Sequence, residues 1–407
     1  MPNVQFVLPF PAPIADRFLT AVAALPGVRV GVVSQEPLER MPPAIARRLA
    51  GHWRVGSCFD AAQLADGVRG LARQMGGPPD RLLGVLEQLQ EPLGAVRDAL
   101  GIPGMGWQAA HNFRDKAQMK TLLREAGIPC ARHCLAESPG PVWELADRAG
   151  FPLVVKPPAG AGAKATFRLD SREQLEGALA SDPPRPAAPW MVEEFIVGDE
   201  QSFDAITIGG RPVWHSLTHY LPTPLEALRH PWIQWCVVLP REVDDPRYDS
   251  IRAAGFRSLE VLGMGTGIAH MEWFRRKDGS IAVSEVAARP PGAQITALMS
   301  YAHEFDFYEA WARLVVFEEF TPPARKWAAG AAFLRGQGEG RVQAVHGVEK
   351  AQREMGHLVV ESKLPRRGQP RSSSYEGEGY VIVRHPETAV VVEALKKLIS
   401  SVRVEVA

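Results

Sequence analysis

The sequence predicts a mixed α/β (α+β) protein built from three consecutive units. Strand and helix patterns alternate from residue 1 to about residue 110, and a pair of short strands joined by a tight turn follows between residues 265 and 293. Residues 323–407 combine several short strands with a closing amphipathic helix. Strict alternation is typical of a parallel sheet covered by helices, whereas a tight turn between strands indicates antiparallel pairing.

The bulk composition fits a globular protein of two to four domains. The chain has 407 residues, of which 46% are hydrophobic and 23% are charged, and its 46 basic residues balance its 46 acidic ones. Without a net charge, no global field attracts nucleic acid or an anionic membrane. We therefore expect no nucleic-acid partner and no membrane partner, and a local site must supply any anion binding.

The cysteines and the N-terminal segment indicate a reducing environment. Cys58, Cys130, Cys134 and Cys236 are too few and too scattered for a disulfide framework, and no second cysteine pair supports a metal held by Cys130 and Cys134. The opening MPNVQFVLPFPAP has no basic segment before a long apolar core, and no apolar run reaches membrane-spanning length. We expect a cytoplasmic protein.

The first unit, residues 1–110, carries strand signals such as VQFVLPF and VRVGVVS between helical segments such as IADRFLTAVAAL. No G-x-G-x-x-G follows its first strand, so the sequence does not support a dinucleotide site. After His111, an amphipathic helix is expected, with Asn112 as its cap and an end at Gly127. Lys116 and Lys120 lie one turn apart on this helix, and a solvated helix face is the alternative interpretation of that pair.

Two segments suggest nucleotide binding. A buried strand ends at Lys156 and precedes a loop with Gly160, Gly162 and Lys164, where glycines would let the backbone approach phosphate oxygens while lysines supply charge. This is not the Walker pattern, and an ordinary glycine-rich turn is the alternative. The second segment, PWMVEEFIVGDEQSF, offers a strand edge for a base and later an acid for ribose, although a hairpin with exposed acids would look the same.

The sequence around GIAHMEWFRRKDGSIAVSEVAAR predicts a β-hairpin of residues 268–275 and 280–286 with a Lys-Asp-Gly turn. Glu272 and Glu285 would face each other on the two strands, and Arg289 would lie just beyond. Two carboxylates beside an arginine suit a polyphosphate bridged by Mg²⁺. A surface hairpin with solvated charges is the alternative.

Taken together, the motifs NFRDKAQMK, VVKPPAGAGAK, EEFIVGDE, H-x-E in GIAHMEWF and E-x-x-x-R in SEVAARPPG occur in the order and spacing of the ATP-grasp superfamily. This resemblance covers roughly residues 1–320, and residues 325–407 resemble the C-terminal domain of the biotin-carboxylase-like carboxylate–amine (L-amino acid) ligases. The resemblance implies an ATP-grasp fold with a Rossmann-like pre-grasp domain and a C-terminal β-rich α+β domain. The implied units are residues 1–110, residues 111–322 with subdomains 111–190 and 191–322, and residues 323–407.

The resemblance also implies a set of ATP contacts. Lys116 and Lys156 would contact the phosphates, and the loop with Gly160, Gly162 and Lys164 would cover them. Glu193, with the backbone of Phe195 and Ile196, would hold adenine. Glu200 would hold the ribose.

For the chemistry, Glu272 and Glu285 would bind Mg²⁺ or Mn²⁺, and Arg289 would stabilise charge on the transferred phosphoryl group. Where familiar members of the superfamily read E-x-N-x-R, this chain has Ala287, which removes one oxygen donor from the second metal. His270 shares a strand face with Glu272, so the resemblance implies that it orients the carboxylate or accepts an amine proton; a packed structural histidine is the alternative.

The predicted activity is that of an ATP-dependent carboxylate–amine ligase, which forms an amide or peptide bond through an acyl phosphate and releases ADP and phosphate. The expected substrates are amino acids. The partners are therefore a small-molecule carboxylate and an amine. A carboxylating or purine-type ligase of the same superfamily and a nucleotide-binding module without turnover remain the alternatives.

Two further segments bear on substrate choice and assembly. Residues 214–240 are dense in aromatics and histidines and are expected to form an ordered loop that favours a bulky or apolar substrate, unless the aromatics only pack the loop. Residues 364–379 are polar and are expected to form a mobile loop. The C-terminal unit can equally be a lid or an oligomerisation domain, which leaves a homodimer open.

Overall fold

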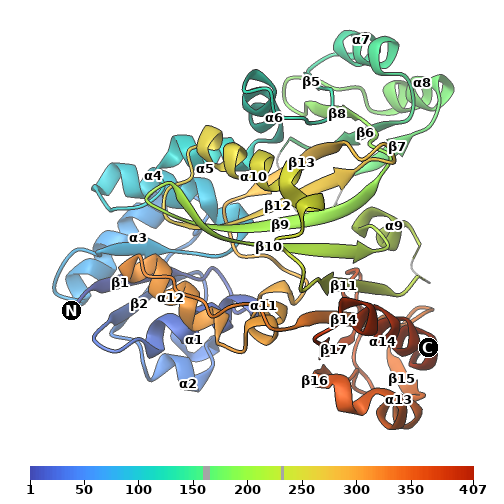
Figure 1. The fold of residues 1–407 in the computed structure, drawn as a ribbon. Coiled ribbons are helices and arrows are strands. Elements are labelled where there is room, and N and C mark those ends of the chain that lie inside the picture. The colour runs from blue at the N-terminus through green and yellow to red at the C-terminus, as the bar shows by residue number, and fades with distance from the viewer. Residues whose placement is uncertain (159–165, 231–232) are drawn as a thin grey trace.

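The computed structural model describes residues 1–158, 166–230 and 233–407. The first unit is a parallel sheet in the order β3-β2-β1-β4, covered by helices (Figure 1). Its strands are β1 (Asn3–Val7), β2 (Arg29–Ser34), β3 (Gly51–Arg54) and β4 (Arg81–Leu83). Its helices are α1 (Pro13–Ala24), α2 (Pro43–Ala46), α3 (Ala61–Gln74) and α4 (Gln90–Leu100). The alternating pattern therefore predicted this unit correctly.

Two helices lead from this unit into a small antiparallel sheet in the order β5-β8-β6-β7. The helices are α5 (Trp107–Arg114) and α6 (Lys116–Glu125). The sheet comprises β5 (His133–Ala136), β6 (Leu153–Lys156), β7 (Phe167–Leu169) and β8 (Trp190–Glu194), with α7 (Pro139–Ala149) and α8 (Arg172–Ser181).

An antiparallel sheet in the order β13-β12-β9-β10-β11-β14-β17-β16 forms the centre of the molecule. Its strands are β9 (Asp199–Ile208), β10 (Arg211–Leu221), β11 (Trp235–Leu239), β12 (Gly267–Arg275), β13 (Ile281–Ala287), β14 (Ala328–Leu334), β16 (Val359–Lys363) and β17 (Gly379–His385). The accompanying helices are α9 (Pro224–Arg229), α10 (Asp249–Leu262), α11 (Ile295–His303) and α12 (Phe307–Phe317). This sheet continues across the boundary expected near residue 322, because β14 pairs directly with β11.

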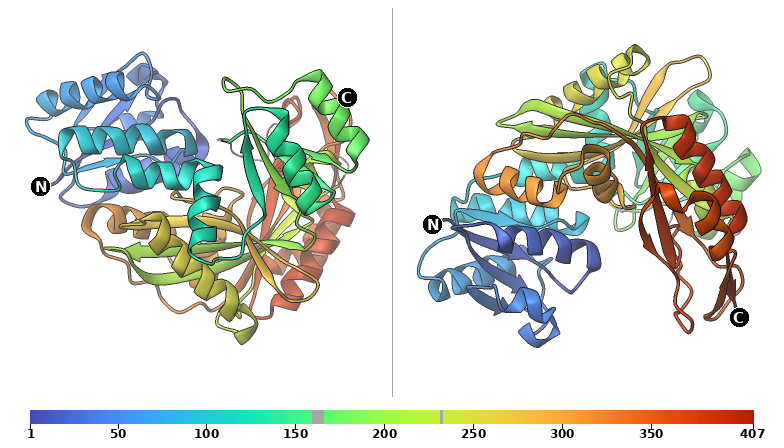
Figure 2. Two further views of the ribbon diagram at one scale, coloured as in Figure 1. Left: turned by 90° about the horizontal axis from the view of Figure 1, so that it is seen from above. Right: turned by 60° about the horizontal axis from the view of Figure 1, so that its bottom comes forward.

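The C-terminal residues add α13 (Val348–Met355), α14 (Thr388–Ser401) and the paired strands β15 (Val342–His346) and β18 (Arg403–Val406). Figure 2 shows the N-terminal unit and the small sheet on two sides of the molecule, with strands of the central sheet between them. Within the described ranges, no helix has both the length and the apolar character that crossing a membrane requires.

The structure tests the predicted hairpin and the predicted helix cap directly. The hairpin is confirmed, since β12 pairs antiparallel with β13 and Glu272 stands opposite Glu285. The helix cap was wrong: Asn112 lies inside α5, and Asp115 caps α6 by accepting a 2.8 Å hydrogen bond from the Gln118 N–H. A short aspartate directly before the helix satisfies a free N–H group that Asn112, one turn earlier, cannot reach.

The segment 214–240 was also predicted wrongly as a loop. Apart from the two residues that the structure does not describe, it consists mainly of β10, α9 and β11. Its bulky side chains are β formers that pack between neighbouring strands, and Trp235 is only 1% exposed. The polar segment 364–379 is held by hydrogen bonds, among them a 3.0 Å bond from Gln369 Nε2 to the Glu378 carbonyl.

Candidate active site

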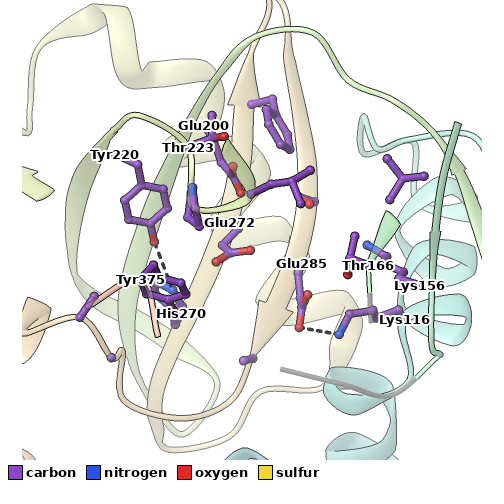
Figure 3. A pocket seen from close by; sticks show the side chains of 18 of the residues that line it. Lys116, Lys156, Thr166, Glu200, Tyr220, Thr223, His270, Glu272, Glu285 and Tyr375 are labelled. Carbon is purple, nitrogen blue, oxygen red and sulfur yellow. Dashed lines mark hydrogen bonds and ion pairs between the residues drawn. The ribbon is translucent and has the colours of Figure 1, made fainter. Parts of the chain in front are cut away.

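A cavity of about 810 Å³ opens where the units meet (Figure 3). Its walls come from the N-terminal unit, the small sheet, the central sheet and the C-terminal residues, represented by Glu87, Lys156, Glu272 and Tyr375. Charged groups dominate one part of the wall and aromatic rings another. All four parts of the fold therefore contribute residues to this cavity.

The β12–β13 hairpin places two carboxylates side by side. Glu272 and Glu285 are register partners, and a β-bulge after Glu272 re-aims the strand at this point. Burial, followed by the repulsion of Glu285, raises the pKa of Glu272. Burial would also raise the pKa of Glu285, but the charges of Lys116 and Lys156 outweigh it and lower that pKa. Two adjacent carboxylates with opposite pKa shifts form an anionic pair that a cation would stabilise.

Lys116 supplies such a cation from the first turn of α6. Its Nζ lies 2.7 Å from Glu285 Oε1, and its side chain is only 6% exposed. Lys120, one turn later, is completely buried and donates a 2.8 Å hydrogen bond to the Ser284 carbonyl. The two lysines therefore face the hairpin, and the solvated-face interpretation of this pair is wrong.

A second cluster of charges joins α6 to the small sheet. Glu193 at the end of β8 lies 2.7 Å from Lys156 Nζ and 3.4 Å from Lys120 Nζ. Burial lowers the pKa of Lys120, whereas Glu193 and Glu285 outweigh burial at Lys156 and raise its pKa. For Glu193 the two lysines outweigh burial and lower the pKa. Lys156 thus lies between Glu193 and the hairpin.

The residues expected at the nucleoside surround the same cavity. Phe195 and Ile196 both line it. The Phe195 N–H already donates a 3.0 Å hydrogen bond to the Pro152 carbonyl, so Phe195 has only its backbone carbonyl left to bind a ligand. Glu200 on β9 is buried, and burial together with the nearby Glu272 raises its pKa well above the ordinary value. Gly160, Gly162 and Lys164 lie outside the described residues.

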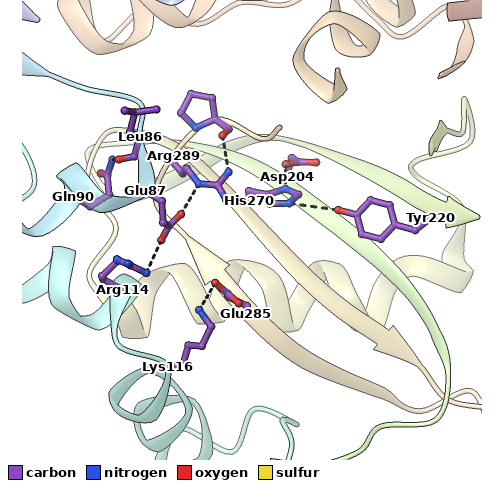
Figure 4. Close-up of polar contacts among 11 residues, drawn as sticks. Leu86, Glu87, Gln90, Arg114, Lys116, Asp204, Tyr220, His270, Glu285 and Arg289 are labelled. Atoms are coloured by element: carbon purple, nitrogen blue, oxygen red, sulfur yellow. Dashed lines mark hydrogen bonds and ion pairs between the residues drawn. The ribbon is translucent and has the colours of Figure 1, made fainter. Parts of the chain in front are cut away.

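Arg289 enters the cavity just after β13 and is held by the N-terminal unit. Its Nε lies 2.5 Å from Glu87 Oε2, and Nη1 donates to the Pro290 carbonyl at 2.9 Å (Figure 4). Glu87 is 6% exposed and also lies 3.8 Å from Arg114 Nη1. Burial would lower the pKa of Arg289, but the charge of Glu87 outweighs it and raises the pKa. The guanidinium is therefore fixed as a permanent cation.

His270 is oriented by a buried aspartate. Nδ1 lies 2.7 Å from Asp204 Oδ1, and Nε2 lies 3.5 Å from the Tyr220 hydroxyl (Figure 4). Asp204 is 0% exposed and is the register partner of His270 on β9. A carboxylate on Nδ1 directs the other ring nitrogen of the histidine toward the cavity that His270 and Tyr220 line.

All predicted site residues within the described ranges line this one cavity, although their roles remain predictions. They are Lys116, Lys156, Glu193, Phe195, Ile196, Glu200, His270, Glu272, Glu285 and Arg289. Sequence reasoning placed Tyr220 in the segment 214–240 that it linked to substrate choice, but it did not single out Glu87, Asp204 or Tyr375. Spacing in the chain carries no signal for these three, because Glu87 and Tyr375 reach the cavity, and Asp204 reaches His270, only through tertiary contacts between distant segments.

The donor set can be tested against a hard divalent cation. Within the described ranges, no group of three or more His, Cys, Asp or Glu side chains is arranged to hold a metal ion. Glu272 and Glu285 nevertheless offer adjacent carboxylate oxygens, which Mg²⁺ prefers, and this ion commonly takes its remaining ligands from water and substrate phosphates. The pair therefore fits a metal that arrives with a phosphate ligand.

The sequence is similar to a known domain family and to several proteins of known sequence. Residues 121–300 match the ATP-grasp domain family. The chain is 24% identical over 248 residues to an L-arginine-specific L-amino acid ligase of Bacillus subtilis, which covers 60% of this chain and 59% of that protein. It is 32% identical over 133 residues to a carbamoyl phosphate synthase large chain of Streptomyces coelicolor, covering 31% of this chain and 12% of that one. The chain thus spans less than two thirds of these curated relatives.

Solved structures share the whole fold. An L-amino acid ligase from Bacillus licheniformis superposes with a TM-score of 0.77 at 20% identity, over 99% of this chain and 98% of that one. An N5-carboxyaminoimidazole ribonucleotide synthetase from Thermotoga maritima gives 0.73 at 18% identity, over 100% of both chains. The fold and the family match agree that residues 121–300 of this chain form an ATP-grasp domain.

Proposed function

We propose that this protein is an ATP-dependent carboxylate–amine ligase that joins amino acids through an acyl phosphate and releases ADP and phosphate. The observation that carries the proposal is the convergence of Glu272, Glu285, Lys116, Lys156 and Arg289 on one cavity. Phosphoryl transfer needs mainly positioning and charge neutralisation, which lysines, an arginine and a carboxylate pair for Mg²⁺ supply.

In this proposal, the chain's own residues divide the work. Lys116 and Lys156 hold the phosphates of ATP, and Glu193 and Glu200 hold the nucleoside. Mg²⁺ or Mn²⁺, when bound with ATP, would lower the negative charge on the phosphates, with Glu272 and Glu285 as its protein ligands. The substrate carboxylate attacks the γ-phosphorus, and the bond to the ADP oxygen breaks.

Arg289 would stabilise charge on the transferring phosphoryl group. The amine then attacks the acyl carbon, phosphate leaves, and His270 Nε2 accepts the proton that the amine loses. The buried Asp204 supports this role because it fixes the ring of His270.

One experiment tests the activity against its alternatives. ADP release is measured with MgATP and pools of amino acids and small acids, each with and without an amine. We expect release that depends on two substrates. Release that requires bicarbonate and an amine would instead assign a carboxylating reaction, which the synthetase-like fold makes the second candidate. Tight ATP binding without release in every pool would contradict both, and would agree with the lost ligand at Ala287.

We also propose a cytoplasmic location and a small-molecule substrate range. Free thiols at all four cysteines, Cys58, Cys130, Cys134 and Cys236, support the reducing location. A homodimer remains a prediction, which light scattering of the purified chain would test.

A further inference from the structure

Three aromatic side chains from separate segments meet in one part of the cavity wall. Tyr220 comes from β10, Trp235 from β11 and Tyr375 from the polar segment before β17. The ring centroids of Tyr375 and Trp235 are 4.6 Å apart in an edge arrangement, and those of Tyr220 and Trp235 are 5.8 Å apart. We call these three residues the aromatic wall.

The aromatic wall lies away from the phosphate-binding lysines. Figure 3 shows Tyr220 and Tyr375 on one side of Glu272, and Lys116 and Lys156 on the other. A nucleotide whose phosphates reach the lysines therefore leaves the wall to a second ligand. That ligand would place its reacting group near Glu272 and its remaining atoms against the rings.

The loop that carries Tyr375 is anchored to the site on two sides. The next residue, Glu376, is half-buried and has a hydrogen bond with the backbone of Ala293, in the segment that follows Arg289. Glu378 accepts a 2.6 Å hydrogen bond from the Gly336 N–H. These bonds fix the ring of Tyr375 in the wall, so the surface is formed before a ligand binds.

Apolar side chains surround the rings. Val85 and Ile295 pack in the same hydrophobic cluster as Tyr220 and Trp235, and Leu86 also lines the cavity. Among the charged groups of the site, Asp204 is paired with His270, and Glu87 with Arg289. Glu226 and Arg229 of α9 also line the cavity, so acids with charged side chains are the competing substrate class.

We propose that Tyr220, Trp235 and Tyr375 form the subsite for the side chain of the carboxylate substrate, and that this side chain is apolar or aromatic. The inference rests on the proposed ligase function and adds the substrate class. Rigid aromatic rings provide a large apolar contact surface with defined ring geometry, which favours side chains such as those of leucine, methionine and phenylalanine.

The acid can be tested alone by using hydroxylamine as the amine. Its nitrogen attacks the acyl carbon, phosphate leaves, and the hydroxamate is measured together with ADP. We expect the wild-type kcat/KM for leucine, methionine or phenylalanine to exceed that for alanine, glutamate, lysine or arginine by about tenfold to a hundredfold, the range that apolar pockets give. A preference for a charged acid would overturn the proposal.

Variants of the wall sharpen the test. Tyr375→Ala should lower kcat/KM for phenylalanine at least tenfold more than it lowers kcat/KM for alanine, whereas Tyr375→Phe should retain the preference. Trp107→Ala, which removes an exposed aromatic outside the cavity, is the matched control. An equal loss for phenylalanine and alanine in Tyr375→Ala would contradict a specificity role.

Calorimetry with ADP, Mg²⁺ and each amino acid separates this inference from the proposed function. Binding that follows the apolar preference without any turnover would refute the ligase and support the subsite. Turnover with no side-chain preference, unchanged in Tyr375→Ala, would refute the subsite and support the ligase.

Discussion

Lys116 and Glu285 form a 2.7 Å ion pair that joins the start of α6 to the second strand of the hairpin. In the proposed reaction the lysine binds phosphate and the glutamate binds metal, so the ligand-free protein pairs the two groups that MgATP must separate. Each of the two charges is thereby compensated by the other before the ligands arrive. In the proposed reaction, nucleotide binding would exchange the pair for phosphate and metal contacts.

Lys116→Met should therefore have opposite effects on the two ligands. We expect ATP affinity to fall about tenfold, because a charged hydrogen bond to phosphate is lost, and Mn²⁺ affinity of the nucleotide-free protein to rise, because Glu285 loses its counter-charge. Calorimetry with ATP and electron paramagnetic resonance with Mn²⁺ measure the two. Lys277→Met in the exposed hairpin turn is the control. Weaker Mn²⁺ binding in Lys116→Met would contradict the exchange.

Glu285→Gln should nearly abolish turnover. The amide keeps the shape of the side chain but removes the charge that a divalent cation needs, and we expect kcat to fall at least about a hundredfold. Steady-state ADP release measures the loss, and thermal unfolding confirms that the fold is retained. Glu260→Gln on the surface of α10 is the matched control. Near-normal activity of Glu285→Gln would refute the metal assignment.

Arg289→Ala should reduce kcat more than it reduces ATP affinity, since its main contribution is to charge that develops in the transition state. We expect about a hundredfold loss of kcat, on the scale of one removed electrostatic donor. Glu87→Gln should give a smaller loss of the same kind, because the guanidinium loses the carboxylate that fixes it. A normal kcat with weaker ATP binding in Arg289→Ala would count against this role.

Asp204→Asn should separate the two halves of the reaction. If Asp204 orients His270 for proton transfer from the amine, amide formation should fall about tenfold to a hundredfold, while acyl phosphate formation should stay within about threefold. Rapid-quench measurement of ADP in the first turnover reports the first half, and product amide reports the second. An equal loss in both halves would indicate a structural effect only.

Glu200→Gln should stabilise the ligand-free protein at high pH. Burial and Glu272 raise the pKa of Glu200 well above 4.5, so its favourable contribution is complete below that unfolded value and is lost as pH rises through the folded pKa. The variant should therefore raise Tm by about 2 °C at pH 8 and have little effect at pH 4. Thermal unfolding across this range, with Glu260→Gln as control, measures the difference. A larger gain at pH 4 would contradict the sign.

The sequence was sufficient where a local pattern determines the structure. The hairpin turn at residues 277–279 and the alternation of the strands 3–7 and 29–34 with helices are such patterns, and both predicted their elements. The exposure of Lys120 could not be judged locally, since a lysine on an amphipathic helix is normally solvated. Only the tertiary contact with Glu193 and Ser284 makes its complete burial tolerable.

Tertiary pairing also explains the other omissions. Asp204 and His270 are 66 positions apart and meet because β9 and β12 are neighbours in the sheet. Tyr375 lies in a polar stretch with no strand or helix pattern, and its ring packs edge-on against Trp235, which is 140 positions earlier in the chain. Residues of this kind can be found only when the order of the strands is known.

The pairing of β11 with β14 has a consequence for engineering this chain. A fragment ending near residue 322 would keep the predicted ATP-binding residues but would leave β11, still paired with β10, without a neighbour on its other edge. Such an open, apolar strand recruits other chains and promotes aggregation. Truncation at that boundary would therefore yield insoluble material, and a shortened version would need a designed strand in place of β14.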